Sequence, residues 1–272
     1  MKYFFSLLTI YFNFIFSQCD GCNPSFQAID LWNIQINCEK KVQNYMDCNS
    51  TNFFTYLTQK QSDINYNEFG SQKWDNGNLE YFYFYDNRYS IDENGLKELE
   101  NVNSLFLDGV PIQLNVESIP LNFEGEHILF RQNGFKTLLT DTQFSENLKY
   151  ISLDENLFYG ELPQYFFNYP NLINLSIEYN NLNGEIPEDL SGAIKLKNFT
   201  LNNNKLSGKV PDSICELQDL KVLHLQYNEL SELPDCICEL KKRGVQIELY
   251  GNKFCNEIPK CIENDIGFQE CF

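Results

Sequence analysis

The middle of the chain repeats one short pattern of apolar and polar positions. In LINLSIEYNNLNGEIP, residues 172–187, apolar residues stand at offsets 0, 3, 5 and 10, and an asparagine stands at offset 8. A helical stripe would continue past the asparagine, and an alternating strand would not stop after three residues at a glycine and a proline. The pattern therefore predicts a strand of about three residues followed by a turn.

Copies of this pattern follow one another at a nearly constant spacing. The clear copies have their asparagines 24 residues apart, and weaker copies precede them at a spacing of 23. The asparagine position is held in turn by Asn87, Val110, Asn133, Asn156, Asn180, Asn204, Asn228 and Asn252. We therefore predict eight repeats of 23–24 residues over residues 79–261.

Each repeat is too small to bury its own apolar residues. The repeats must therefore stack into one continuous core with a cap at each end. Leu175 and Ile177 should point inward and Ser176 outward, from parallel strands about 4.8 Å apart. Asn180 should turn inward and satisfy backbone groups of the turns above and below it. The asparagine column is thus predicted to be structural rather than catalytic.

The order L-x-x-L-x-L-x-x-N-x-L resembles the leucine-rich repeat. Tails of the form Gly-x-(Ile/Leu/Val)-Pro, at Gly160–Pro163, Gly184–Pro187 and Gly208–Pro211, resemble the plant-type subclass, which includes extracellular receptor ectodomains and polygalacturonase-inhibiting proteins. Segment 230–234 is one residue short of that pattern, and the first three repeats lack the tail. The resemblance implies an α/β solenoid, a horseshoe with a parallel β-sheet on its concave face, that serves as a ligand-recognition scaffold.

The two ends of the chain predict export and capping. Residues 1–17 combine Lys2, a short apolar run and Ser17, as in a secretory signal peptide, with a membrane anchor or a core helix as the alternative. We expect an N-terminal cysteine-containing cap over residues 18–78 and a C-terminal cap tail over residues 262–272. A secreted or extracellular protein without a membrane span after signal cleavage is predicted.

The ten cysteines gather at the two ends of the chain, which fits disulfide-stapled caps in an oxidising compartment. Four of them, Cys19, Cys22, Cys38 and Cys48, lie near the N-terminus, and their pairing stays open. The other six lie near the C-terminus, where the repeat suggests a pairing.

Equivalent positions of stacked repeats should lie about 5 Å apart, within disulfide range. Cys215 and Cys238 both stand four residues after a proline, whereas Cys236 and Cys261 both stand two residues after one. The predicted bridges are Cys215–Cys238, Cys236–Cys261 and, by elimination, Cys255–Cys271.

Charge and motifs narrow the function. The chain has 38 acidic and 20 basic side chains, a net charge of −18, which is the opposite of a nucleic-acid-binding footprint and favours a basic partner. His127 and His224 lie four repeats apart, so they cannot share a metal ion. Asp154 and Glu178 are ordinary neighbours on one column of the sheet. We expect no enzyme activity, no cofactor and no metal site.

The resemblance implies that the outward strand residues line the binding surface. Aromatic and acidic residues are interleaved most densely in the first four repeats, and such residues anchor and steer protein partners. The expected partner-binding residues are Tyr81, Tyr83, Tyr85, Asp86, Phe106, Asp108, Tyr150 and Asp154. Thr200 and Gln226, further along the face, are expected to contribute little.

Three sequons, at Asn49, Asn174 and Asn198, are expected to carry glycans. The function predicted from all these features is a secreted, non-enzymatic recognition scaffold for a protein partner. The alternative is a structural or adhesive cell-surface component that binds polysaccharide or self-associates.

Overall fold

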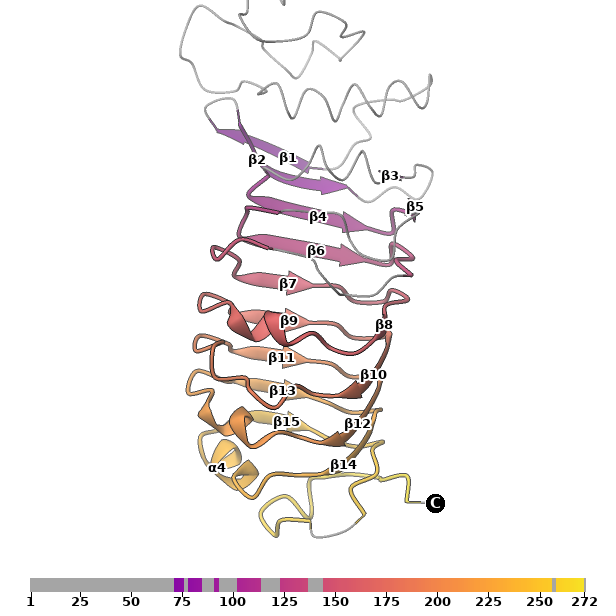
Figure 1. Ribbon diagram of the computed structural model, residues 1–272, viewed down its shortest axis with the longest axis vertical. Coiled ribbons are helices and arrows are strands. Elements are labelled where there is room, and N and C mark those ends of the chain that lie inside the picture. Colours follow the sequence, from indigo (N-terminus) through magenta and orange to yellow (C-terminus); the bar gives the residue numbers. More distant parts are fainter. Residues whose placement is uncertain are drawn as a thin grey trace, which may run out of the picture.

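The computed structural model describes residues 71–75, 78–84, 91–92, 102–113, 123–136, 144–255 and 258–271. Over these residues the chain forms a solenoid whose strands stack along one axis (Figure 1). The predicted signal segment, most of the N-terminal cap with its four cysteines, and Asn49 lie outside the described residues. Among the described residues, no helix has the length and apolar character needed to cross a bilayer.

One long sheet runs through the described part of the chain in the order β1-β2-β4-β6-β7-β9-β11-β13-β15. Its strands from β2 onward pair in parallel, and each predicted repeat contributes one of them. The predicted position of the strand within each repeat is therefore confirmed. The strands are β1 (Ser71–Asp75), β2 (Asn78–Phe84), β4 (Ser104–Asp108), β6 (His127–Arg131), β7 (Tyr150–Ser152), β9 (Asn174–Ser176), β11 (Asn198–Thr200), β13 (Val222–His224) and β15 (Gln246–Glu248). β1 pairs antiparallel with β2 and covers that edge.

The register keeps equivalent residues of neighbouring turns side by side. Leu175 pairs with Ile151 on one side and Phe199 on the other, and all three side chains are fully buried. Because strand side chains alternate between faces, the residues between them point to the solvent side of the sheet. We call this solvent side the concave face, and we include in it the residues between each strand and the next column asparagine, except the inward apolar residue.

A second parallel sheet lies beside the first and was not predicted from the sequence. It contains β8 (Tyr159–Gly160), β10 (Asn181–Glu185), β12 (Lys205–Lys209) and β14 (Glu229–Glu232) (Figure 1). A further short pair is β3 (Ile91–Asp92) with β5 (Ile112–Gln113). The glycine tails belong to this sheet: Gly184 has φ +75°, and a Cβ there would lie 2.9 Å from Cγ of Glu161.

Short helical turns follow two of the three tail prolines. Pro163 precedes the 3-10 helix η2 (Gln164–Asn168), and Pro211 precedes the 3-10 helix η3 (Asp212–Glu216). The shortened segment 230–234 is followed instead by an α-helix, α4 (Ile237–Lys242). The convex side therefore changes its helix type near the C-terminal end.

The asparagine column is structural, as predicted, but its bonds run in one direction. Asn180 is 8% exposed, and its Nδ2 donates to the Leu153 carbonyl of the preceding turn (3.0 Å) and to the Glu178 carbonyl of its own turn (2.9 Å). Its Oδ1 accepts from Phe158 N in the preceding turn (3.0 Å). Its side chain thus satisfies the turn on one side of it, whereas contact with both neighbouring turns was expected. The other asparagines that bond the preceding turn through both amide atoms are Asn156, Asn204, Asn228 and Asn252.

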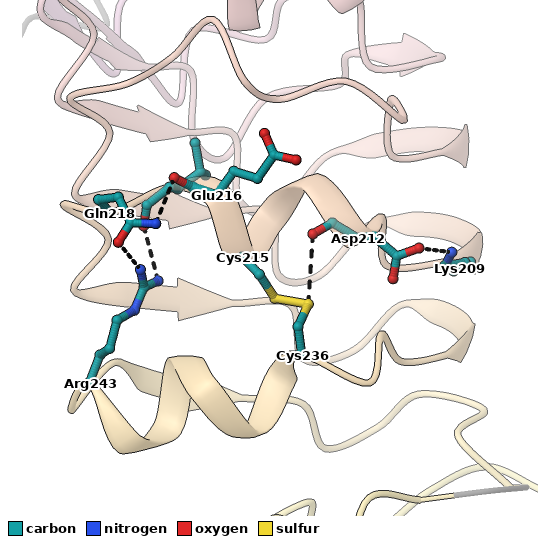
Figure 2. The surroundings of a disulfide bond; sticks show 8 residues. Lys209, Asp212, Cys215, Glu216, Gln218, Cys236 and Arg243 are labelled. Carbon is teal, nitrogen blue, oxygen red and sulfur yellow. Dashed lines mark hydrogen bonds and ion pairs between the residues drawn. A yellow bond between two sulfur atoms is a disulfide. The ribbon is translucent and has the colours of Figure 1, made fainter.

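Two of the three predicted C-terminal disulfide pairings are wrong. The structure joins Cys215 to Cys236, with Cα atoms 6.1 Å apart (Figure 2). It also joins Cys238 to Cys261, with Cα atoms 5.7 Å apart. Each bridge links the residue four after one proline to the residue two after the next. The predicted bridge Cys255–Cys271 is present.

The reason is the direction of the side chains. Equivalent residues of stacked turns are related mainly by translation, so their Cα–Cβ bonds are close to parallel, whereas a disulfide needs Cβ atoms about 3.8 Å apart on converging bonds. Figure 2 shows the offset pair meeting between η3 and the start of α4. Arg243, at the end of α4, adds a polar contact between these turns by donating to Gln218 Oε1 and to the Leu217 carbonyl, both at 3.0 Å.

Candidate recognition surface

The N-terminal half of the concave face holds the aromatic residues singled out from the sequence. The rings of Tyr83 and Phe106 pack edge to face with centroids 6.4 Å apart, and both are only partly exposed. Tyr150 is 39% exposed and is the most accessible of the three. The side chain of Tyr81, and the residues Tyr85 and Asp86, lie outside the described residues.

The aspartates of this half are engaged within the face. Asp154 accepts from Ser176 Oγ (2.7 Å), Glu178 N (2.8 Å) and Ser152 Oγ (2.6 Å), so its carboxylate links two neighbouring strands. Asp108 Oδ2 accepts from the Tyr83 hydroxyl at 3.3 Å. Both carboxylates contribute negative charge to the face, but the positions of their oxygens are set by the protein itself.

Arg131, on this half of the face, forms an ion pair with Glu155 of the next turn. Arg131 Nε donates to Glu155 Oε1 at 2.8 Å, and Gln132 donates to the other oxygen of the same carboxylate. The hydrogen bonds from Gln132 and from Arg131 lower the pKa of Glu155. The hydrogen bond to Glu155 raises the pKa of Arg131. The positive charge of Arg131 is therefore balanced by Glu155, and the charges of Asp108 and Asp154 keep this half of the face negative.

His127 stands between two side chains of neighbouring strands. Its Nδ1 lies 2.9 Å from Ser104 Oγ, and its ring stacks on Tyr150 with centroids 4.9 Å apart. Partial burial lowers the pKa of His127 below its ordinary value of 6.5; nearby Glu126 opposes this shift, and Lys149 adds to it. Neutral His127 therefore supports Tyr150 by stacking.

The two sequons of the repeat region share one column of the face. Asn198 Nδ2 donates to Asn174 Oδ1 (3.2 Å), and Asn174 Nδ2 donates to the Ile151 carbonyl (3.0 Å). Both side chains are partly exposed. A glycan on either amide would replace one of these bonds.

The C-terminal half of the face contains two exposed tyrosines outside the expected binding set. Tyr179 and Tyr227 are 54% and 51% exposed, and each directly precedes an asparagine of the buried column. Both have positive φ, +52° and +57°, a backbone region that β-carbon-bearing residues seldom adopt. The position before the column asparagine is the sequence signal that could have found them.

Between these tyrosines, the face buries two amide side chains. Asn202 and Gln226 are 3% and 8% exposed, and they occupy the same position in consecutive turns. Asn202 Nδ2 donates to Glu178 Oε2 at 3.1 Å. The carbonyl oxygens of both amides are buried and have no hydrogen-bond partner in the part of the chain that the structure describes.

Three segments of the chain, residues 171–193, 195–217 and 219–240, match the family model of the leucine rich repeat. They coincide with three successive predicted repeats. No curated protein sequence matches the chain.

Solved structures are similar to this chain over part of its length. The BIR2 ectodomain from Arabidopsis thaliana is 28% identical over 42% of this chain and 60% of its own, with a TM-score of 0.36. The plant peptide hormone receptor RGFR1, solved in complex with RGF2, is 24% identical over 65% of this chain and 32% of its own, with a TM-score of 0.41. A plant ice-binding protein is 16% identical over 77% of this chain and 65% of its own, with a TM-score of 0.51. The chain thus spans about 60% of the first of these proteins and about a third of the second.

Proposed function

Because the chain is a leucine-rich repeat protein, we propose that it is a secreted, non-enzymatic scaffold that binds a protein partner through its concave face. One observation carries the proposal: Tyr150, Tyr179 and Tyr227 stand 39%, 54% and 51% exposed on or beside a continuous sheet. Exposed aromatic rings on a fixed backbone are typical anchors of protein interfaces. The apolar N-terminal run and the three disulfides support a location outside the cytosol.

The rigidity of the face favours binding. Thr200 Oγ1 donates to Ser176 Oγ (2.8 Å), which in turn donates to Asp154, so side-chain bonds cross three successive strands. Backbone pairing runs through the same strands without a register shift. A surface held in this way loses little conformational entropy when a partner binds.

The charge of the chain favours a basic partner surface. The net charge is −18, and on the concave face Arg131 is paired with Glu155. Negative potential steers association more than it adds affinity. To the contact residues expected from the sequence, the proposal adds the exposed Tyr179 and Tyr227. The expected residues are Tyr81, Tyr83, Tyr85, Asp86, Phe106, Asp108, Tyr150 and Asp154.

Glycans at Asn49, Asn174 and Asn198 are part of the proposal. Glycans at Asn174 and Asn198 would cover the part of one column that follows Tyr150, and the partner would then use the aromatic N-terminal half of the face. Mass spectrometry before and after enzymatic deglycosylation of the secreted protein would show which of the three sequons are occupied.

The test is to capture a partner and map its footprint. The purified protein is incubated with culture medium of the source cells, bound proteins are identified by mass spectrometry, and affinity is measured for single variants. We expect Tyr83→Ala, Phe106→Ala and Tyr150→Ala each to weaken binding by more than about 1 kcal/mol, and high salt to weaken it further. The exposed convex variant Glu188→Ala is the control.

Melting temperature separates lost contact from lost folding, because Tyr83 and Phe106 also pack against each other. A partner whose affinity is unchanged in all three variants, and is insensitive to salt, would contradict the proposal. Sedimentation of the purified protein tests the adhesive alternative, since a scaffold for a separate partner should sediment as a monomer.

A further inference from the structure

Two buried carbonyl oxygens on the concave face lack a donor among the described residues. They belong to Asn202 and Gln226, which are only 3% and 8% exposed. The backbone joins their turns, since Asn203 N donates to the Gln226 carbonyl at 3.0 Å. A buried acceptor without a donor is unfavourable, so a bound group that supplies N–H donors would be stabilised here.

The neighbours of these amides define a site, which we call the amide–tyrosine patch: Glu178, Asn202, Gln226 and Tyr250 in successive turns, with Tyr179 and Tyr227 beside them. Backbone bonds hold the two rows together, from Tyr179 N to the Asn202 carbonyl (3.0 Å) and from Tyr227 N to the Tyr250 carbonyl (2.9 Å). The Tyr227 and Tyr250 rings meet edge to face at 5.1 Å. Gly251 makes room for this arrangement, because a Cβ there would lie 2.5 Å from the Tyr227 ring.

The chemistry of the patch is that of a cation receptor. It contains a carboxylate at Glu178, exposed aromatic rings, and two buried carbonyl oxygens that have no hydrogen-bond partner in the part of the chain that the structure describes, and its six residues include no cation. The Glu178 carboxylate accepts from Asn202 Nδ2, and this leaves the Asn202 oxygen as the free end of the amide. Burial and the nearby Glu248 raise the pKa of Tyr250, consistent with negative surroundings.

We propose that the amide–tyrosine patch binds an arginine side chain, presented by the protein partner. The inference rests on the proposed function and names the chemistry that the partner must carry. A guanidinium group has five N–H donors in one plane, so it can donate to both amide oxygens while its face stacks on a tyrosine ring. Its charge is attracted by Glu178 and by the ring faces. An ammonium group is compact and strongly hydrated, and it cannot span the two acceptors in this way.

This assignment differs from the sequence expectation that Gln226 contributes little to binding. The expectation followed from counting aromatic residues per repeat, which favoured the first four repeats. Burial of Gln226 without a partner for its oxygen is visible only when the neighbouring turns are in place.

The experiment is a titration of the full-length ¹⁵N-labelled protein, followed by the side-chain amide signals of Asn202 and Gln226. The probes are three capped tripeptides, Gly-Arg-Gly, Gly-Lys-Gly and the same peptide with citrulline, which keeps the shape of arginine without its charge. We expect saturable shifts of both signals with the arginine peptide, and binding about tenfold weaker with lysine or citrulline. Equal responses to arginine and citrulline would show that the charge of the guanidinium group plays no part in binding. No shift with any peptide would show that none of them reaches the two oxygens. Either result would overturn the inference.

Variants confirm the location. Gln226→Leu and the exposed-ring variant Tyr179→Ala should each weaken arginine-peptide binding by about tenfold, whereas Tyr150→Ala, in another column, should leave it unchanged. Tyr179→Ala alters an exposed side chain, so it remains informative if Gln226→Leu folds poorly. An arginine peptide that binds both variants with native affinity contradicts the site.

Failure of this inference can be told apart from failure of the proposed function. A captured partner that loses affinity in Tyr83→Ala and Tyr150→Ala but binds Gln226→Leu and Tyr179→Ala normally would leave the function standing and overturn the arginine site. A partner that binds all four variants normally would overturn the proposed function itself.

Discussion

Gln269 binds the turn of Asn252 in the way that Asn252 binds the turn before it. Gln269 Nε2 donates to the Leu249 carbonyl at 3.1 Å, and its Oε1 accepts from Phe254 N at 3.2 Å. Asn252 makes the corresponding pair of bonds to its own preceding turn, at 2.9 and 3.1 Å. The C-terminal tail therefore supplies one more member of the buried amide column, with glutamine in place of asparagine.

Gln269→Leu should destabilise the C-terminal end. The substitution removes the acceptor of Phe254 N and the Gln269 donor to the Leu249 and Ile266 carbonyls, at a cost of about 1–3 kcal/mol. The Leu249 carbonyl keeps its bond from Asn252 Nδ2. The neighbouring exposed variant Glu270→Gln is the control, because its backbone N–H bond to Asn252 is retained. Urea denaturation with the disulfides intact measures both. Equal midpoints for the two variants would mean that the tail does not cap the solenoid through Gln269.

Asn180→Leu tests the column in the middle of the solenoid. Leucine cannot replace the bonds to Leu153 O and Phe158 N, so the free energy of unfolding should fall by about 1–3 kcal/mol. That corresponds to about 2–4 °C of melting temperature per kcal/mol in a chain of this size. Glu188→Ala, on the exposed convex side, should melt like the natural protein. Equal melting of the two variants would contradict the structural role of the asparagines.

Free-thiol labelling distinguishes the two disulfide patterns. Cys215→Ser should expose the thiol of Cys236, its partner in the structure, and leave Cys238 oxidised. The protein is alkylated without reduction and digested, and the peptide that contains Cys236 and Cys238 is fragmented between these two residues in the mass spectrometer. The fragments show which of the two cysteines carries the label. A label on Cys238 would support the Cys215–Cys238 bridge that was predicted from the sequence and would contradict the pairing in the structure. The double variant Cys215→Ser/Cys236→Ser should give no label on the four remaining C-terminal cysteines.

His127 should make stability depend on pH. Its pKa is lowered in the folded protein by burial, so the unfolded chain takes up a proton at a higher pH than the folded chain does. The unfolded state then binds more protons between the two pKa values, and stability falls as pH drops from the ordinary value of 6.5 toward the folded pKa. Above that window the contribution is complete.

The measurement compares melting temperature at about pH 7.5 and about pH 5.5 for the natural protein and for His127→Gln. The loss on acidification should be smaller in the variant, since its side chain does not titrate. Carboxylates contribute to acid sensitivity in both proteins, so the difference between the two losses is the quantity that matters. An identical loss would mean that His127 does not contribute.

The repeat itself was predictable because it depends on local alternation and on a spacing along the chain. Residues at the repeat positions of Leu175 and Ile177 point inward in every turn of the stacked sheet. Because these positions recur every 24 residues, they set each strand, its register and its neighbouring strands. Asn180 is determined in the same way, since an inward turn leaves backbone groups that an amide side chain at this position can satisfy. These features follow from the sequence alone because translation from one turn to the next preserves them.

Other features depend on how side chains point between turns, and spacing does not contain that information. Cys215 is joined to Cys236, whereas Cys238, at the position equivalent to Cys215 in the next turn, is joined to Cys261. Gln269 joins the amide column because the tail folds back, although its distance from Asn252 breaks the period. The unpaired oxygens of Asn202 and Gln226 likewise depend on which donors their neighbours use. The tertiary structure decided these contacts because hydrogen bonds and disulfides require direction as well as distance.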